Sequence, residues 1–173
     1  ENIDITHKII DNYKPVNNTN SLDLQNPFIS NNLSKSIKLL KYSIQFTFST
    51  NNINYKIYIF YNKTTLSKIK QLIKNIIIYI SFISSFSTQK KSVTIKYYLT
   101  NQKKTMNNKK IFSSNEVNSG SATMYGNEIN IWRKEELLKV TLHELLHILN
   151  VNIPNRINPE LLEYYNTKYN LEM

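Results

Sequence analysis

The stretch His143-Glu144-Leu145-Leu146-His147 places two imidazoles and one carboxylate within five consecutive residues. Four residues make slightly more than one turn of an α-helix, so His143 and His147 would project from one face and could converge on a single metal ion. Glu144 would lie about 100° round the helix from His143, close to that ion. The chain has only three histidines, so this spacing would rarely arise by chance. The sequence therefore predicts a metal site on a helix.

The residues around this pentapeptide predict one amphipathic helix from Arg133 to Leu149. No glycine or proline interrupts the segment. Glu135 and Glu136 fall in its first turn, where carboxylates favour the positive end of the helix dipole. Apolar residues recur at helical spacing at Leu138, Leu142, Leu145, Leu146 and Leu149.

The His-Glu-x-x-His pattern resembles that of the zincin metallopeptidases, a superfamily defined by such a helix. The resemblance implies that His143 and His147 bind Zn²⁺ and leave a coordination position for water, whose pKa the metal lowers to about 7. It also implies that Glu144 is the general base, which takes a proton from that water and passes it to the departing amine of a polypeptide substrate. The expected activity is that of a zinc-dependent endopeptidase, which is a hydrolase.

The third protein ligand would distinguish the zincin subfamilies. A metzincin continues to a glycine and a third histidine, but no histidine follows His147 in this chain. The remaining histidine, His7, lies far upstream, and we interpret it as an ordinary surface side chain. A glutamate ligand, similar to that of the gluzincins, is the remaining option.

In gluzincins the glutamate ligand comes from the helix after the zinc helix, commonly from its second turn. Pro159 is well placed to begin such a helix, with Asn158 as its cap. This placement favours Glu163 as the third ligand. The alternatives are Glu160, Glu172 and a ligand outside the chain.

Two features depart from the gluzincin pattern. The spacing from His147 to Glu163 is short, and Thr167 stands where the family often has an acidic residue that orients a zinc histidine. A solvated helix face is the competing interpretation of Glu160 and Glu163. Help to the developing oxyanion could come from one of three tyrosines in this segment: Tyr164, Tyr165 and Tyr169.

Upstream of the motif, the chain has the elements that a zincin lobe needs. Residues 42–48 and 55–60 alternate with period two around a polar stretch, which predicts a β-hairpin. Residues 66–86 have apolar positions at helical spacing and predict a buried backing helix. Its uninterrupted apolar run is too short for a transmembrane segment, which takes about 20 residues. Residues 93–99 predict a third strand.

The only two glycines of the chain both precede the predicted zinc helix. Gly126-Asn127 is suited to a two-residue hairpin turn between strands at 119–125 and 128–132. In zincins the strand nearest the cleft is an edge strand that hydrogen-bonds an extended peptide, and we assign this role to Ser121 to Tyr125. The alternative is an edge hairpin that binds nothing.

This order of elements predicts an α+β fold: a zincin-like lobe whose mixed twisted sheet, with an edge strand over the cleft, packs against a backing helix and the zinc helix. A length of 173 residues suits one domain. Asparagine and proline recur over residues 1–36, where we expect an irregular N-terminal arm or extension. The zincin-like metallopeptidase domain would then occupy residues 37–173.

A net charge of +10 and a pI near 9.6 would ordinarily suggest nucleic acid or another anionic partner. The excess is nearly all lysine, since Arg133 and Arg156 are the only arginines. Abundant lysine, asparagine and isoleucine together are typical of an AT-rich coding sequence, and no nucleic-acid-binding motif accompanies them. We therefore attribute the charge mainly to genome bias and do not expect nucleic acid as a partner.

The chain has no cysteine, which excludes disulfides and thiolate metal ligands. Histidine and carboxylate remain as the strong metal ligands. A cysteine-free chain is compatible with a reducing cytoplasm but does not determine localisation. The sequence does not predict an oligomeric state.

The block from Asn118 through Glu136 into the zinc helix is also similar to uncharacterised metallopeptidase-like proteins of large DNA viruses. This similarity covers about a third of the chain. It suggests an alternative function as a catalytically silent zincin-fold module with a structural or interaction role, for example in a viral particle. The intact Glu144 favours an enzyme, because a silent module has no chemical need for the base.

Overall fold

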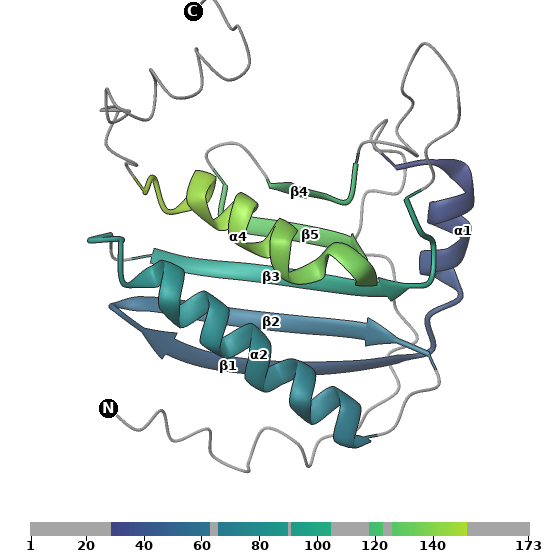
Figure 1. The fold of residues 1–173 in the computed structure, drawn as a ribbon, viewed down its shortest axis with the longest axis horizontal. Helices are drawn as coiled ribbons and strands as arrows, with labels where there is room; N and C mark the ends of the chain where they lie inside the picture. Colours follow the sequence, from purple (N-terminus) through teal and green to yellow (C-terminus); the bar gives the residue numbers. More distant parts are fainter. Residues whose placement is uncertain (1–28, 63–65, 90, 105–117, 123–125, 152–173) are drawn as a thin grey trace, which may run out of the picture.

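A computed structural model describes residues 29–62, 66–89, 91–104, 118–122 and 126–151, which form one mixed sheet with helices against it (Figure 1). In chain order the elements are α1 (Asn31–Lys38), β1 (Tyr42–Thr50), β2 (Ile53–Tyr61), α2 (Leu66–Ser84), β3 (Lys91–Thr100), β4 (Gly120–Ala122), β5 (Glu128–Arg133), the 3₁₀ turn η2 (Lys134–Glu136) and α4 (Leu137–Ile148). The strand order across the sheet is β1-β2-β3-β5-β4. The predicted α+β class with a mixed sheet is confirmed.

β1 and β2 form the predicted antiparallel hairpin, and both strands are longer than the period-two pattern indicated. They pair without interruption as far as Thr50 and Ile53. Asn51 and Asn52 turn the chain with φ values of 49° and 61°. A two-residue turn with positive φ at both positions matches the right-handed twist of the strands, and asparagine tolerates this conformation better than most residues.

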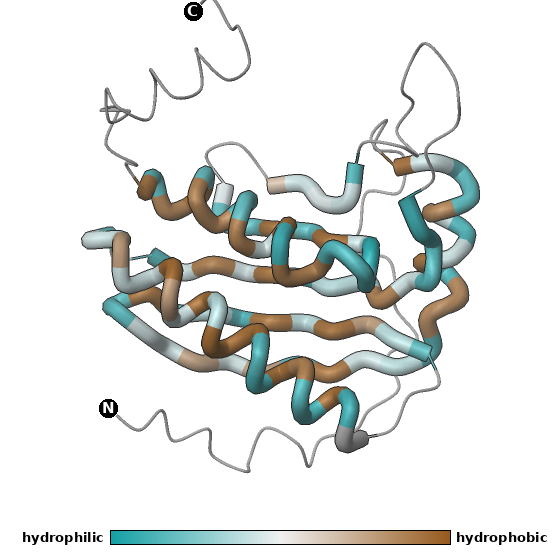
Figure 2. The backbone as a smooth tube through the Cα atoms, viewed as in Figure 1, coloured by the Kyte–Doolittle hydropathy of each residue, from teal (hydrophilic) through white to brown (hydrophobic). Residues whose placement is uncertain are grey.

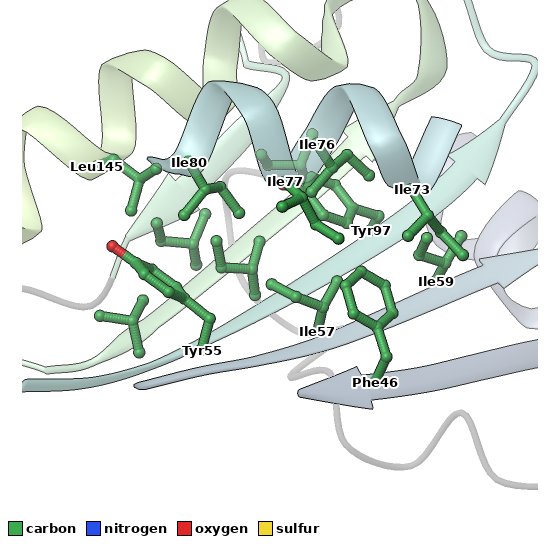
Figure 3. Close-up of a cluster of buried hydrophobic side chains, with 14 of the residues drawn as sticks. Phe46, Tyr55, Ile57, Ile59, Ile73, Ile76, Ile77, Ile80, Tyr97 and Leu145 are labelled. Atoms are coloured by element: carbon green, nitrogen blue, oxygen red, sulfur yellow. The ribbon is translucent and has the colours of Figure 1, made fainter. Parts of the chain in front are cut away.

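α2 connects β2 to β3 and covers one face of the sheet. This confirms a buried helix after the hairpin, which ends at Ser84 and not at residue 86 as predicted. β2 and β3 are parallel, so the chain must cross back over the sheet between them. Figure 3 shows isoleucines of α2 pointing into apolar side chains of the strands. The buried side chains of this core include Phe46, Tyr55, Ile57, Ile59, Ile73, Ile76, Ile77, Ile80 and Tyr97.

None of the described helices is long and apolar enough to cross a membrane.

α4 lies beside α2 and carries the His-Glu-x-x-His motif, but it begins later than predicted. Arg133 is still part of β5, and the α-helix begins at Leu137, after η2. The Arg133 guanidinium donates to the carbonyl oxygens of Asn118, at 3.0 Å, and Gln102, at 3.5 Å. These bonds hold Arg133 at the end of the strand. They join segments far apart in sequence, which helical periodicity alone cannot reveal.

β4 is the outermost strand and pairs antiparallel with β5, which is itself parallel to β3. The predicted two-residue turn at Gly126-Asn127 is wrong. Ala122 pairs with Ile129, so residues 123–128 separate these paired positions, and no glycine among the described residues has the positive φ that such a turn requires. The edge position predicted for Ser121 to Tyr125 is confirmed for residues 121 and 122, whereas residues 123–125 lie outside the described ranges.

α1 packs on the face of the sheet opposite α2 and α4, in a region where we expected an irregular arm up to residue 36. Ser30 caps the helix by accepting a hydrogen bond from the Leu33 backbone N–H at 3.3 Å. Leu33 and Ile37 are one turn apart, and both are buried. The strand side chains in this second core are Phe60, Tyr98 and Trp132. Residues 31–36, which we expected to belong to an irregular arm, are therefore part of α1.

Candidate metal centre

α4 brings His143 and His147 together on its exposed side. Their Nε2 atoms lie 3.2 Å apart, and the ring centroids are 4.7 Å apart with the rings at 81° to each other. This approach follows from the helix, because side chains four residues apart project from adjacent turns of the same face. Both side chains are exposed, so a solute can reach the pair.

The separation of the two Nε2 atoms suits joint ligation of one ion. Two nitrogens bound to a tetrahedral zinc at about 2.0–2.1 Å would lie about 3.3 Å apart. The same 3.2 Å distance also allows one neutral ring to donate its N–H to the other. Zn²⁺ is an ion of borderline softness that binds imidazole nitrogen well, and this cysteine-free chain offers imidazole nitrogens and no thiolates. The histidine pair therefore fits a zinc ion.

The direction of the histidines follows from how α4 packs. Its buried residues Thr141 and Leu145 face the sheet, and the histidines project from the other side. Val140 and Glu144, one turn apart, lie between these two sides. Val140 is close to Gly120 of β4, so this flank of α4 faces the edge strand. The histidines lie next to this flank, on the exposed side of α4.

Glu144 is half-buried on the same helix as the histidine pair. Burial raises the pKa of its carboxyl above the ordinary value, and the electrostatic influence of the neighbouring His143 and His147 partly opposes this rise. A carboxylate with a raised pKa is a better proton acceptor at neutral pH. This environment suits the general base that the motif predicts.

A buried hydroxyl pair anchors the sheet-facing side of α4 to β3. Thr141 donates to the Leu137 carbonyl oxygen at 2.7 Å, and the Tyr97 hydroxyl lies 3.1 Å from the same Thr141 oxygen. Because the Thr141 proton is used within the helix, Tyr97 donates the second bond. Leu145 is fully buried beside this contact. Together these contacts fix the rotation of α4 and thus the direction of the histidines on its other side.

The C-terminal end of α4, which carries His147, is tied to the segment that leads from α2 into β3. The Lys91 ammonium donates to the Ile148 carbonyl oxygen at 3.0 Å. Ser87 donates to the Leu149 carbonyl oxygen at 3.3 Å. A cation is favourable here because the last carbonyl groups of a helix carry partial negative charge.

Glu136 anchors the N-terminal end of α4, a role that the sequence did not reveal. Ser119 donates to its carboxylate, and the Lys104 ammonium lies 3.1 Å from the same group. Burial opposes ionisation of Glu136, but the bonds from Ser119 and Lys104 outweigh burial and lower the pKa of the carboxyl. Ser119 directly precedes β4, so this contact also holds the edge strand near α4. The partners are 17 and 32 residues from Glu136, beyond the reach of a local pattern.

A cavity of about 550 Å³ lies towards the other end of α4, away from the histidines. Its lining includes Leu40, Ile69, Leu99 and Lys134, and the last of these precedes the helix. The histidine pair, in contrast, lies on an open surface in the C-terminal half of α4.

The predicted third ligand lies outside the described residues. This applies to Glu163 and to its alternatives Glu160 and Glu172. His7 and the three candidate tyrosines, Tyr164, Tyr165 and Tyr169, lie outside as well. Among the residues that the structure describes, no three or more His, Cys, Asp or Glu side chains are grouped to hold a metal. A complete zinc site would need at least one further ligand from elsewhere.

No known protein family matches the chain, and neither does any curated protein or solved structure.

Proposed function

We propose that the protein is a zinc-dependent endopeptidase with a zincin-like lobe, in which His143 and His147 hold the metal. The observation that carries this proposal is the 3.2 Å separation of the two Nε2 atoms on the exposed side of α4. In the proposed lobe α2 is the backing helix, α4 is the zinc helix, and β4 is the edge strand beside the cleft. Glu163 is the proposed third ligand, with Glu160, Glu172 or a group outside the chain as alternatives.

Zn²⁺, when bound, supplies a Lewis acid and lowers the pKa of a ligated water to about 7. Glu144 supplies the proton transfers. Its carboxylate takes a proton from the attacking water and passes it to the departing amine nitrogen. The raised pKa of the half-buried carboxyl supports this role, because the carboxylate is then a stronger base.

β4 would hold the polypeptide substrate. It is the outermost strand, and its outer backbone groups can pair with an extended peptide by β-augmentation. The approach of Val140 to Gly120 supports this arrangement, because it puts the edge strand beside the flank of α4 that also carries Glu144. A peptide that extends the sheet at β4 would therefore pass close to the base.

The proposal is tested by measuring zinc content and cleavage of a peptide library for four chains: native, Glu144→Gln, Glu163→Gln and Glu135→Gln. Loss of the base should reduce cleavage by about 10²–10⁴-fold without loss of zinc. Glu163→Gln should lose zinc. The exposed Glu135 lies in η2, so the same substitution there is the matched control and should preserve both properties.

Three outcomes would change the proposal. A native chain that binds no zinc contradicts it. Zinc without cleavage in the native chain would favour the silent structural or interaction module. Unchanged zinc affinity in Glu163→Gln would move the third ligand to Glu160, Glu172 or outside the chain.

A further inference from the structure

Four large apolar side chains are exposed on the outer side of α2 and in the turn that follows it. Ile78, Tyr79, Phe82 and Phe86, here called the apolar patch, are 61%, 42%, 58% and 57% exposed. The three helical positions fall within an arc of about 100°. The rings of Phe82 and Phe86 pack edge to face, with centroids 5.2 Å apart. The patch is therefore one continuous surface.

The apolar patch has no part in the core. The opposite side of α2 already fills the space over the sheet with buried isoleucines, as Figure 3 shows. Figure 2 shows the hydrophilic residues of α2 mainly towards its N-terminal end and mostly hydrophobic residues along its C-terminal half. A continuous apolar surface of this kind on a folded protein commonly marks an interaction site.

The same helix carries positive charge and no negative charge. Lys68, Lys70 and Lys74 are exposed on its N-terminal half, and residues 66–89 contain no aspartate or glutamate. Within the described ranges, none of these three lysines forms an ion pair. The apolar patch therefore adjoins unneutralised positive charge, which attracts anionic surfaces.

The size of the apolar patch argues against a protein partner, including a second copy of the chain. An aromatic side chain presents about 150–250 Å² of surface, so four large side chains that are about half exposed offer about 400 Å². A specific protein interface buries about 800 Å² on each partner. Binding to a lipid surface does not require a contact area of this size, because a few inserted apolar side chains and neighbouring lysines are enough for attachment.

We propose that the apolar patch docks α2 onto the surface of an anionic membrane. Phe82 and Phe86 enter the boundary between headgroups and acyl chains, and Tyr79 lies at headgroup level, where tyrosine is favoured. Lys70 and Lys74 attract the anionic headgroups. The contact is peripheral, in keeping with the absence of a membrane-spanning helix from the described residues. It does not depend on the metal centre.

Co-sedimentation of the full chain with lipid vesicles tests this proposal. The native chain should bind phosphatidylcholine vesicles that contain phosphatidylserine, bind pure phosphatidylcholine much more weakly, and lose affinity as salt is added. Phe82→Ser combined with Phe86→Ser should weaken binding by on the order of a hundredfold. Lys70→Gln combined with Lys74→Gln should weaken it by about thirtyfold. Leu39→Ser is the matched control, since Leu39 is 66% exposed but lies outside the patch.

Fluorescence provides a second measurement, in which only one side chain of the apolar patch is replaced. The chain has no cysteine, so Phe82→Cys allows a polarity-sensitive dye to be attached at one position. Emission should shift to the blue with phosphatidylserine vesicles for this label and not for a label at Leu39→Cys. No shift at position 82, or an equal shift at position 39, overturns the proposal. A dimer in ultracentrifugation that the two serines abolish, without vesicle binding by the native chain, overturns it in favour of self-association.

Discussion

Gly120 on β4 lies so close to Val140 on α4 that a Cβ atom at position 120 would be 2.6 Å from the Val140 Cγ1 atom. It would also lie 3.0 Å from the carbonyl oxygen of Asn130. Both distances are shorter than normal contacts, so only glycine allows the edge strand this close to the helix. The relationship bears on the proposed function, because Val140 is one turn before Glu144, the proposed base.

Gly120→Ala should therefore destabilise the fold, with a decrease of about 1–3 kcal/mol in the free energy of unfolding. The penalty should be smaller in a Val140→Ala background, because that substitution removes the methyl group that the new Cβ would meet. Urea unfolding of the four chains of this double-mutant cycle measures the coupling. An equal penalty in both backgrounds would mean that the contact between strand and helix does not require glycine.

Two buried tyrosines make the stability of the fold sensitive to alkali. Burial raises the pKa of Tyr55 to about 12, although its hydrogen bond with Ser84, at 2.6 Å, opposes the rise. Burial likewise raises the pKa of Tyr97 above its ordinary value. In the unfolded chain a tyrosine ionises near pH 10. The stabilisation is complete below about pH 10 and is lost as the pH rises towards the folded-state pKa.

The free energy of unfolding should accordingly fall between about pH 10 and 12, by about 2 kcal/mol for Tyr55 alone. Tyr55→Phe should reduce this pH dependence, since the variant has one fewer group to ionise. Tyr42→Phe is the control, because Tyr42 is 40% exposed. Urea unfolding at a series of pH values measures the effect for both variants. The same slope in Tyr55→Phe as in the native chain would contradict the assignment.

The elements predicted correctly are those whose signal is local. The β1–β2 hairpin follows from alternation, and α2 follows from isoleucines at helical spacing. The convergence of His143 and His147 follows from their four-residue spacing alone. In each case the pattern lies within one segment and needs no knowledge of what packs against it.

The elements predicted wrongly depend on contacts between distant segments. The register of β4 shows this most clearly. A two-residue turn at Gly126-Asn127 would have placed Ala122 opposite Ile131, in the position that Gly120 occupies. The Ala122 side chain would then meet Val140, so packing against α4 overrides the local turn signal. α1 is a similar case, because its two buried residues need an aromatic cluster formed by three separate strands.

Zinc should stabilise the folded chain, and this effect should require both histidines of α4. A free zinc concentration of 100 times Kd would add about 2.7 kcal/mol to the free energy of unfolding, seen as a higher Tm that a chelator reverses. His143→Ala and His147→Ala should each remove the increase. His7→Ala, the remaining histidine, is the matched control. An increase that survives in His147→Ala, or disappears in His7→Ala, would contradict a metal centre on α4.

The backbone of β4 alternates between inward and outward hydrogen bonding. The Trp132 N–H donates to the Ser119 carbonyl oxygen at 3.0 Å, which makes these two residues a hydrogen-bonded pair. In an antiparallel ladder such pairs alternate with pairs that do not bond to each other. Ser121 is therefore the next residue bonded to β5, and Ala122 directs its N–H and C=O outward, away from the sheet. The outward groups are those that an extended peptide would use.

Ala122→Pro should then separate substrate binding from folding. Proline removes an N–H that no strand of the sheet uses and is tolerated on an edge strand, so Tm and zinc content should change little. KM for a cleaved peptide should rise by about tenfold, because one backbone hydrogen bond to the substrate is lost. Ser121→Pro should instead lower Tm, since that N–H is directed at β5. If Ala122→Pro cleaves with unchanged KM while remaining folded, the peptide does not extend the sheet at β4.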